Sequence, residues 1–95
     1  MKVAPVVYAD SPVRVGSQIK FTFTDNEQWR KAITEISGSY KGIPGSSVNF
    51  KSVAQITNGE IKVPKEYYVY NPSGTAIITI KATGYEDTVV TVIVQ

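Results

Sequence analysis

The chain contains no cysteine and no histidine among its 95 residues. These residues supply the thiolate and imidazole groups that dominate zinc, copper, haem and iron–sulfur sites. Without them, nucleophilic catalysis by Ser-His or Cys-His pairs is excluded as well. For haem iron, tyrosine and the single methionine, Met1, are the only usual ligands left. We therefore expect no catalytic residues, no metal site, no cofactor and no enzyme activity.

The sequence also has little net charge and no long hydrophobic run. Ten Lys and Arg residues against eight Asp and Glu residues give a charge of +2, and the two signs alternate along the chain. Nucleic-acid binders gather positive charge on one face, so we expect no nucleic-acid partner. No stretch reaches the roughly 20 apolar residues that span a bilayer, and the N-terminus does not resemble a signal peptide. Membrane insertion is therefore not expected.

Length and composition fit one small globular domain. Apolar residues make up 42% of the chain and charged residues 19%, as in ordinary folded proteins. Ninety-five residues have room for a single hydrophobic core. We expect residues 1–95 to form one domain, taken from a larger multidomain surface or secreted protein, because Gln95 directly follows an apolar strand.

Short alternating segments separated by turns predict an all-β fold. Residues 18–24 alternate apolar and polar side chains, and Pro5 makes the segment 3–8 suitable only for a sheet edge. Asn58-Gly59 predicts a type I′ hairpin. About seven strands with regular turns predict an immunoglobulin-like antiparallel β-sandwich. The expected strands are 3–8, 18–24, 33–37, 48–56, 60–63, 75–83 and 88–94.

One short helix is expected at about residues 26–33. Asp25 and Gln28 have the spacing of a capping box, which places the helix start at Asp25. Trp29 and Ile33 then lie on one side of the helix with Ala32, while Arg30 and its neighbour Lys31 face water. The glycine-rich stretch 38–47 is interpreted as a loop.

Tyrosines are the candidate binding residues. Tyr67, Tyr68 and Tyr70 form the densest aromatic cluster, and Tyr40 lies in the predicted glycine-rich loop. Tyrosine is enriched at protein interfaces, although solvent-edged structural tyrosines are commoner.

Trp29 and Tyr85 are interpreted as structural residues. With Ile33, Trp29 is expected to close one end of the sandwich, although a lone tryptophan also suits partner or sugar binding. Tyr85 follows Gly84 at a turn, and its hydroxyl is expected to bond to backbone as in a tyrosine corner.

Two stretches resemble a known family. The segment 26–36, with a tryptophan leading into Ala32-Ile33, and the segment 79–87 followed by the last strand are similar to the haemoglobin-interacting domain of Shr-like proteins. The similarity extends over roughly residues 18–95. It implies a β-sandwich module on secreted or wall-anchored proteins of Gram-positive bacteria, in some of which the module captures haemoglobin.

Three functions follow as hypotheses. The first is a non-catalytic accessory or spacer module whose partners are the neighbouring domains of its parent protein. The second is a module that binds haemoglobin or another protein, and the third is a carbohydrate-binding module. We expect a monomer, located outside the cell or on the Gram-positive cell wall.

Overall fold

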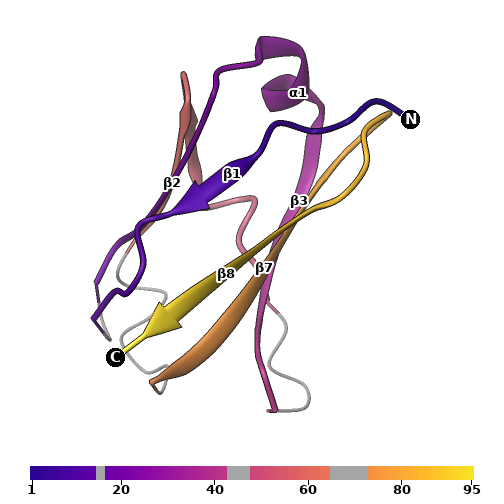
Figure 1. The fold of residues 1–95 in the computed structure, drawn as a ribbon. Helices are drawn as coiled ribbons and strands as arrows, with labels where there is room; N and C mark the ends of the chain where they lie inside the picture. The colour runs from indigo at the N-terminus through magenta and orange to yellow at the C-terminus, as the bar shows by residue number, and fades with distance from the viewer. Residues whose placement is uncertain (15–16, 43–47, 65–72) are drawn as a thin grey trace.

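The computed structural model describes residues 1–14, 17–42, 48–64 and 73–95 and contains two packed four-stranded antiparallel sheets (Figure 1). The first sheet has the order β1-β2-β6-β5, and the second has the order β4-β3-β7-β8. Lettered A to G along the chain, these orders read ABED and C′CFG, the arrangement of immunoglobulin-type sandwiches. The predicted all-β sandwich is confirmed.

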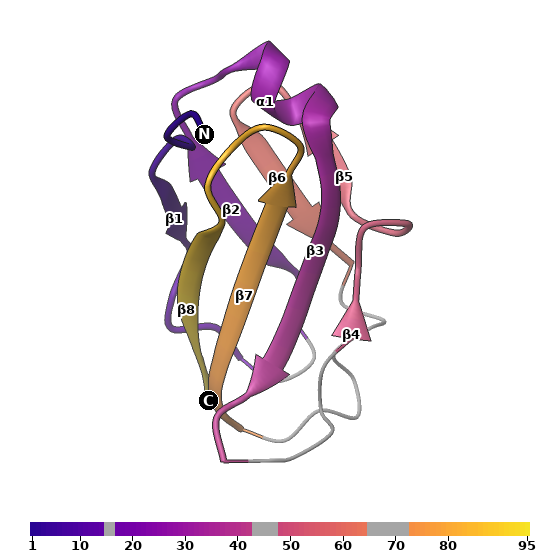
Figure 2. The same ribbon diagram turned by 90° about the vertical axis from the view of Figure 1, so that its right-hand side faces the viewer.

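The elements have the following bounds. In the first sheet, β1 is Val7–Ala9, β2 is Ile19–Phe23, β6 is Glu60–Val63 and β5 is Gln55–Thr57. In the second sheet, β4 is Val48–Asn49, β3 is Ile33–Tyr40, β7 is Gly74–Ala82 and β8 is Thr88–Val94. The helix α1, Glu27–Ala32, lies across one end of the sandwich (Figure 2). None of the described helical residues forms a segment long and apolar enough to cross a membrane.

Alternation along the strands determines which side chains face the core. In β2, Ile19, Phe21 and Phe23 are buried, whereas Thr22 between them is exposed. The same period-two pattern buries every second residue of β7 and β8, because successive side chains of a strand point to opposite sheet faces. The strands predicted over 75–83 and 88–94 are therefore confirmed.

The helix begins one residue later than predicted. Asn26 is the N-cap, and its Oδ1 accepts a hydrogen bond of 3.0 Å from the Trp29 backbone N–H. The capping box led by Asp25 was wrong because that carboxylate instead accepts hydrogen bonds from Arg30 and from Gly59. Arg30 is consequently only 16% exposed along its side chain rather than facing water.

The stretch predicted as a loop from residue 38 begins as strand. β3 continues to Tyr40, and Gly38 lies buried in it, close to Ile78 and Phe50. The register of β3 shifts between Ile33 and Glu35, which is a β-bulge. Ile33 and Ile36 both point into the core as a result, whereas a regular strand would place them on opposite faces.

The strand predicted over 48–56 is divided into β4 and β5. Between them the chain turns at Phe50, whose carbonyl accepts hydrogen bonds from the backbone N–H groups of Val53 and Ala54. Phe50 itself enters the core. The Asn58-Gly59 hairpin between β5 and β6 is confirmed, but only Gly59 has a positive φ, 72°, so the turn is not type I′.

The N-terminal segment connects the two sheets. Its middle forms β1 at the edge of the first sheet, as predicted, but over Val7–Ala9 rather than 3–8, so Pro5 lies before the strand. Lys2 and Val13 form parallel bridges to Tyr85, in the turn between β7 and β8, and to Val94 of β8. β1 and β8 consequently lie side by side (Figure 1). The segment therefore closes one long side of the sandwich.

Candidate interaction surfaces

Tyr40 is the one predicted binding tyrosine that the described residues include. It lies at the end of β3 remote from the helix, paired with Ala76, and is half-buried against the core rather than displayed on a loop. Burial raises the pKa of its hydroxyl above the ordinary tyrosine value. Tyr67, Tyr68 and Tyr70 lie outside the described residues, so their role stays a prediction.

Tyr8 is an exposed aromatic residue that the sequence reasoning did not select. It points outward from β1, opposite Thr22, with 65% of its surface exposed. Beside it, a hollow of about 240 Å³ is lined by Ala9, Asp10, Lys20 and Thr22. The sequence does contain a signal for this exposure. Tyr8 directly follows the apolar Val7, which is buried, and successive residues of a strand face opposite sides of the sheet.

The outer face of the first sheet carries a compact charge network. Lys20 and Lys62 are direct cross-strand neighbours, and the Glu60 carboxylate lies 3.0 Å from the first ammonium and 3.8 Å from the second. The hydrogen bond from Lys20 lowers the pKa of Glu60 below its ordinary value. Glu60 thus offsets the repulsion that two opposed lysines would otherwise exert across the ladder.

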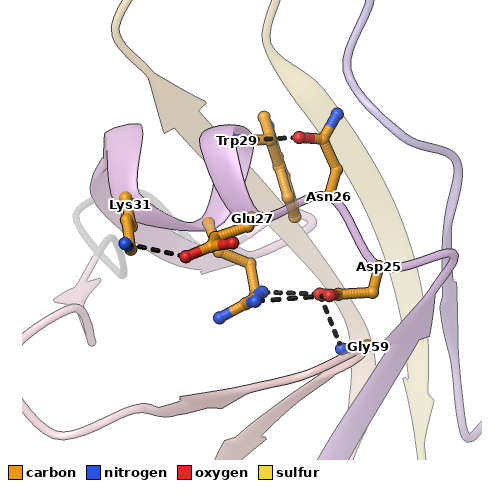
Figure 3. Close-up of polar contacts among 7 residues, drawn as sticks. Asp25, Asn26, Glu27, Trp29, Lys31 and Gly59 are labelled. Carbon is orange, nitrogen blue, oxygen red and sulfur yellow. Dashed lines mark hydrogen bonds and ion pairs between the residues drawn. The ribbon is translucent and has the colours of Figure 1, made fainter.

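A second polar cluster lies at the helical end (Figure 3). The Asp25 carboxylate accepts hydrogen bonds from Arg30 Nε and Nη2, the latter at 3.2 Å, and from the Gly59 backbone N–H at 3.1 Å. It therefore joins the end of β2 to the helix and to the β5–β6 hairpin. On the helix surface, Lys31 pairs with Glu27 at 2.8 Å.

These carboxylates are poorly suited to acid catalysis. The pKa of Asp25 is lowered mainly by its hydrogen bond with Arg30, and that of Glu27 mainly by its hydrogen bond with Lys31. A general acid in glycoside hydrolysis needs a raised pKa to hold its proton near neutral pH. Asp25, Glu27 and Glu60 are all ionised at pH 7 and act as partners for cations.

Asp25 is expected to make the domain acid-sensitive. Because its pKa is lower in the folded chain than in the unfolded chain, its contribution to stability is full above about pH 4. That contribution is lost as the pH falls through the lowered value. Asp25→Asn should therefore lower the thermal midpoint at pH 7, and the difference from the wild type should shrink below pH 4.

The matched control is Glu27→Gln, since Glu27 also has a lowered pKa, but within the described part of the chain its ion pair is the exposed one with Lys31. Exposed pairs contribute little to stability. Thermal denaturation of both variants from pH 7 to pH 2.5 is the measurement. A constant difference between Asp25→Asn and the wild type over that range would contradict a role for the ionised carboxylate.

The three residues interpreted as structural are buried. Trp29 is 0% exposed, Ile33 5% and Tyr85 7%, so none presents a surface to a partner in this conformation. The Trp29 and Phe23 rings meet edge to face, with centroids 4.9 Å apart. Among the described residues, the tyrosine-corner hydrogen bond expected of Tyr85 is not formed. The ammonium of Lys2 instead lies 5.5 Å from its ring centroid.

The sequence of this sandwich matches one family profile, described as heme-binding protein Shr-like, Hb-interacting domain. The match extends over residues 7–95 and thus includes both sheets and the helix. The chain belongs to this family. A comparison with individually curated proteins gives no match.

Haem does not fit the described residues of this Shr-like domain. Tyr40 and Tyr85 lie at opposite ends of the second sheet, and Tyr8 points outward from the first. Among the described residues, the hollow beside Tyr8 is lined by Ala9, Asp10, Lys20 and Thr22, a mostly polar set that does not suit the apolar faces of a porphyrin. The described residues therefore do not support direct ligation of haem.

Proposed function

We propose that this domain binds haemoglobin as a non-catalytic interaction module on a cell-surface protein. The family match over residues 7–95 carries the proposal, since the family is described by its interaction with Hb. It supports haemoglobin capture more strongly than the spacer function that the sequence alone favoured.

The architecture suits a module that presents a preformed surface. Both sheets are joined by a core of fully buried side chains that includes Phe21, Trp29, Ile36 and Ile80. The N-terminal segment closes one long side by bridging to β8. A sandwich held in this way loses little conformational freedom when a partner docks, which favours binding by a rigid outer surface.

Haemoglobin is the ligand rather than free haem. The chain has no histidine or cysteine, and its described tyrosines are spread over separate parts of the molecule. Protein recognition needs complementary surface rather than a porphyrin cavity, and this domain provides sheet faces.

The proposal is tested by titrating the immobilised 95-residue domain with haemoglobin. We expect saturable binding with a Kd on the order of micromolar, because a small domain without a deep pocket offers a modest interface. Myoglobin and an unrelated β-sandwich serve as controls for nonspecific adsorption. A flat response up to high micromolar haemoglobin would refute the proposal and restore the spacer hypothesis.

The same titration tests the predicted tyrosines. A double variant, Tyr68→Ala with Tyr70→Ala, removes two of the three clustered candidates, and Tyr40→Phe tests the half-buried one without removing its ring. Loss of binding in the double variant would make that cluster part of the contact. Unchanged binding would exclude it.

Carbohydrate binding is a second candidate, favoured by the exposed Tyr8 ring next to the polar hollow. An aromatic ring with hydrogen-bonding groups beside it suits a sugar, which has both apolar and hydroxyl surfaces. A glycan array probed with the wild type and Tyr8→Ala decides this function. Absence of hits for the wild type would eliminate it.

A further inference from the structure

The outer face of the second sheet has a central region without charge. One row of cross-strand neighbours runs from Ser37 of β3 through Thr79 of β7 to Val89 of β8. In the next row, Ile77 of β7 lies beside Thr91 of β8. Ile93 continues the face along β8. We call this region the uncharged face, defined by Ser37, Ile77, Thr79, Val89, Thr91 and Ile93.

The uncharged face is accessible and partly apolar. Val89 is 62% exposed and Ile93 48%, and Thr91 between them is exposed too. Apolar β-branched residues that repeat along one outward edge strand are costly to leave in water. Large exposed hydrophobic residues gathered on one face are typical of an interaction site.

The two outer faces differ sharply in what a partner must dehydrate. On the first sheet, docking would bury the network of Lys20, Glu60 and Lys62, and removing such charges from water is expensive. On the uncharged face, mainly hydroxyls and apolar groups lose water, and the nearest carboxylate, that of Glu35, accepts a hydrogen bond of 3.4 Å from Ser37 at its margin. Cores of protein interfaces are depleted of charged residues for this reason.

Charge at one end of the uncharged face indicates the chemistry of the partner. Glu35 and Lys81 form a long pair there, at 3.9 Å. Glu86 and Asp87, in the turn that precedes β8, are exposed, and the described residues provide neither with an ion pair. A complementary surface would have an uncharged, apolar centre and a Lys, Arg or His side chain facing these two carboxylates.

The size of the face argues against a second copy of this chain as its occupant. Three strands about 4.8 Å apart, of which β8 contributes the longest stretch at five residues, give a face of at most roughly 15 Å by 17 Å. Two such faces packed together would bury on the order of 500 Å², less than half of what a stable interface needs. A larger partner can also contact the adjoining β1–β8 edge, where Val3 and Val6 are exposed.

We infer that the uncharged face is the surface on which haemoglobin docks, with the exposed Val89, Thr91 and Ile93 along its β8 side and the carboxylates of Glu86 and Asp87 at its rim. The inference rests on the proposed function and names the surface that performs it. Apolar contact supplies affinity, and the rim carboxylates orient the approach of a basic group on haemoglobin.

The test compares one substitution on opposite faces. Thr91→Arg places a long cation on the uncharged face between the exposed Val89 and Ile93, and Thr22→Arg places the same side chain on the outer face of β2. Both positions are exposed strand residues, so both variants should fold. We expect Thr91→Arg to weaken haemoglobin binding by at least about tenfold and Thr22→Arg by less than about twofold.

A charge variant supplies a second measurement. Glu86→Gln with Asp87→Asn should slow association and reduce the dependence of the association rate on salt, with little effect on dissociation. The matched control is Asp10→Asn, which removes an exposed carboxylate beside the first sheet. Equal salt dependence in all three proteins would overturn the assigned role of the rim.

The outcomes separate the surface from the function. Suppose that the wild type binds haemoglobin but that both variants lose affinity equally, or that only Thr22→Arg loses affinity. The contact would then lie elsewhere on the domain, and the proposed function would still stand. No binding by the wild type would remove both proposals. A dimer in sedimentation that Thr91→Arg dissociates would identify a second copy as the occupant and overturn the inference.

Discussion

Replacing Trp29 with alanine is expected to lower the free energy of unfolding by about 3–5 kcal/mol, the range for removing a large aromatic side chain from a core. Trp29 is 0% exposed and packs edge to face against Phe23. A domain of this size has a total stability on the order of 5–15 kcal/mol, so the variant should be close to unfolded at 37 °C. Urea denaturation followed by far-UV circular dichroism measures the loss.

Trp29→Phe is the matched control. The indole Nε1 has no hydrogen-bond partner among the described residues, so phenylalanine keeps an aromatic ring and removes a buried donor without a partner. We expect this variant to lose much less stability than the alanine variant. Equal losses in the two variants would show that ring packing at this position is not what holds the helix on the sandwich.

Gly38→Ala is expected to lower the free energy of unfolding by about 1–3 kcal/mol, the usual effect of overpacking a core. A Cβ at this position would lie 2.8 Å from Ile78 Cδ1 and 2.9 Å from Phe50 Cε2. Both distances are well inside van der Waals contact, and both neighbours are buried side chains that have little room to move.

Ser39→Ala, at the next position of β3, is the control for Gly38→Ala. Ser39 points away from the core, so its substitution should change stability by no more than about 0.5 kcal/mol. Thermal and urea denaturation of both variants provide the comparison. A Gly38→Ala protein as stable as the wild type would mean that Phe50 can move aside at no cost.

Local sequence patterns predicted several elements correctly. The alternation of Ile19, Phe21 and Phe23 predicted β2, and the β-branched run at the end of the chain predicted β8. The spacing of Trp29 and Ile33 predicted a short helix, but the helix ends at Ala32, and Ile33 already belongs to β3. These signals are local, because period and turn chemistry act within a few residues.

The errors occurred where nonlocal contacts prevail over local preference. Asp25 had the sequence position of an N-cap, but the Gly59 backbone N–H and Arg30 hold it elsewhere. Gly38 was interpreted as part of a loop because glycine weakens strands. In the folded chain, the absence of a side chain at Gly38 leaves room for Phe50 and Ile78. This requirement for glycine comes from tertiary packing and is not visible in the local sequence.

The candidate surface was visible in the sequence only in part. Tyrosine content drew attention to Tyr40, Tyr67, Tyr68 and Tyr70, whereas exposure in the described chain selects Tyr8 and the β8 edge instead. The uncharged face combines residues from three strands that are up to 56 positions apart, from Ser37 to Ile93. Strand register brings them together, and register is set by long-range pairing.

The sequence by itself determined the fold class, the alternation of buried and outward residues in β7 and β8, and the family of this domain. Each of these depends on residue types at short spacing. The tertiary structure decided which strands are neighbours, where β3 bulges and which outer face is free of charge. Those features depend on contacts between distant segments, whose free energy of packing exceeds the local preferences of the residues involved.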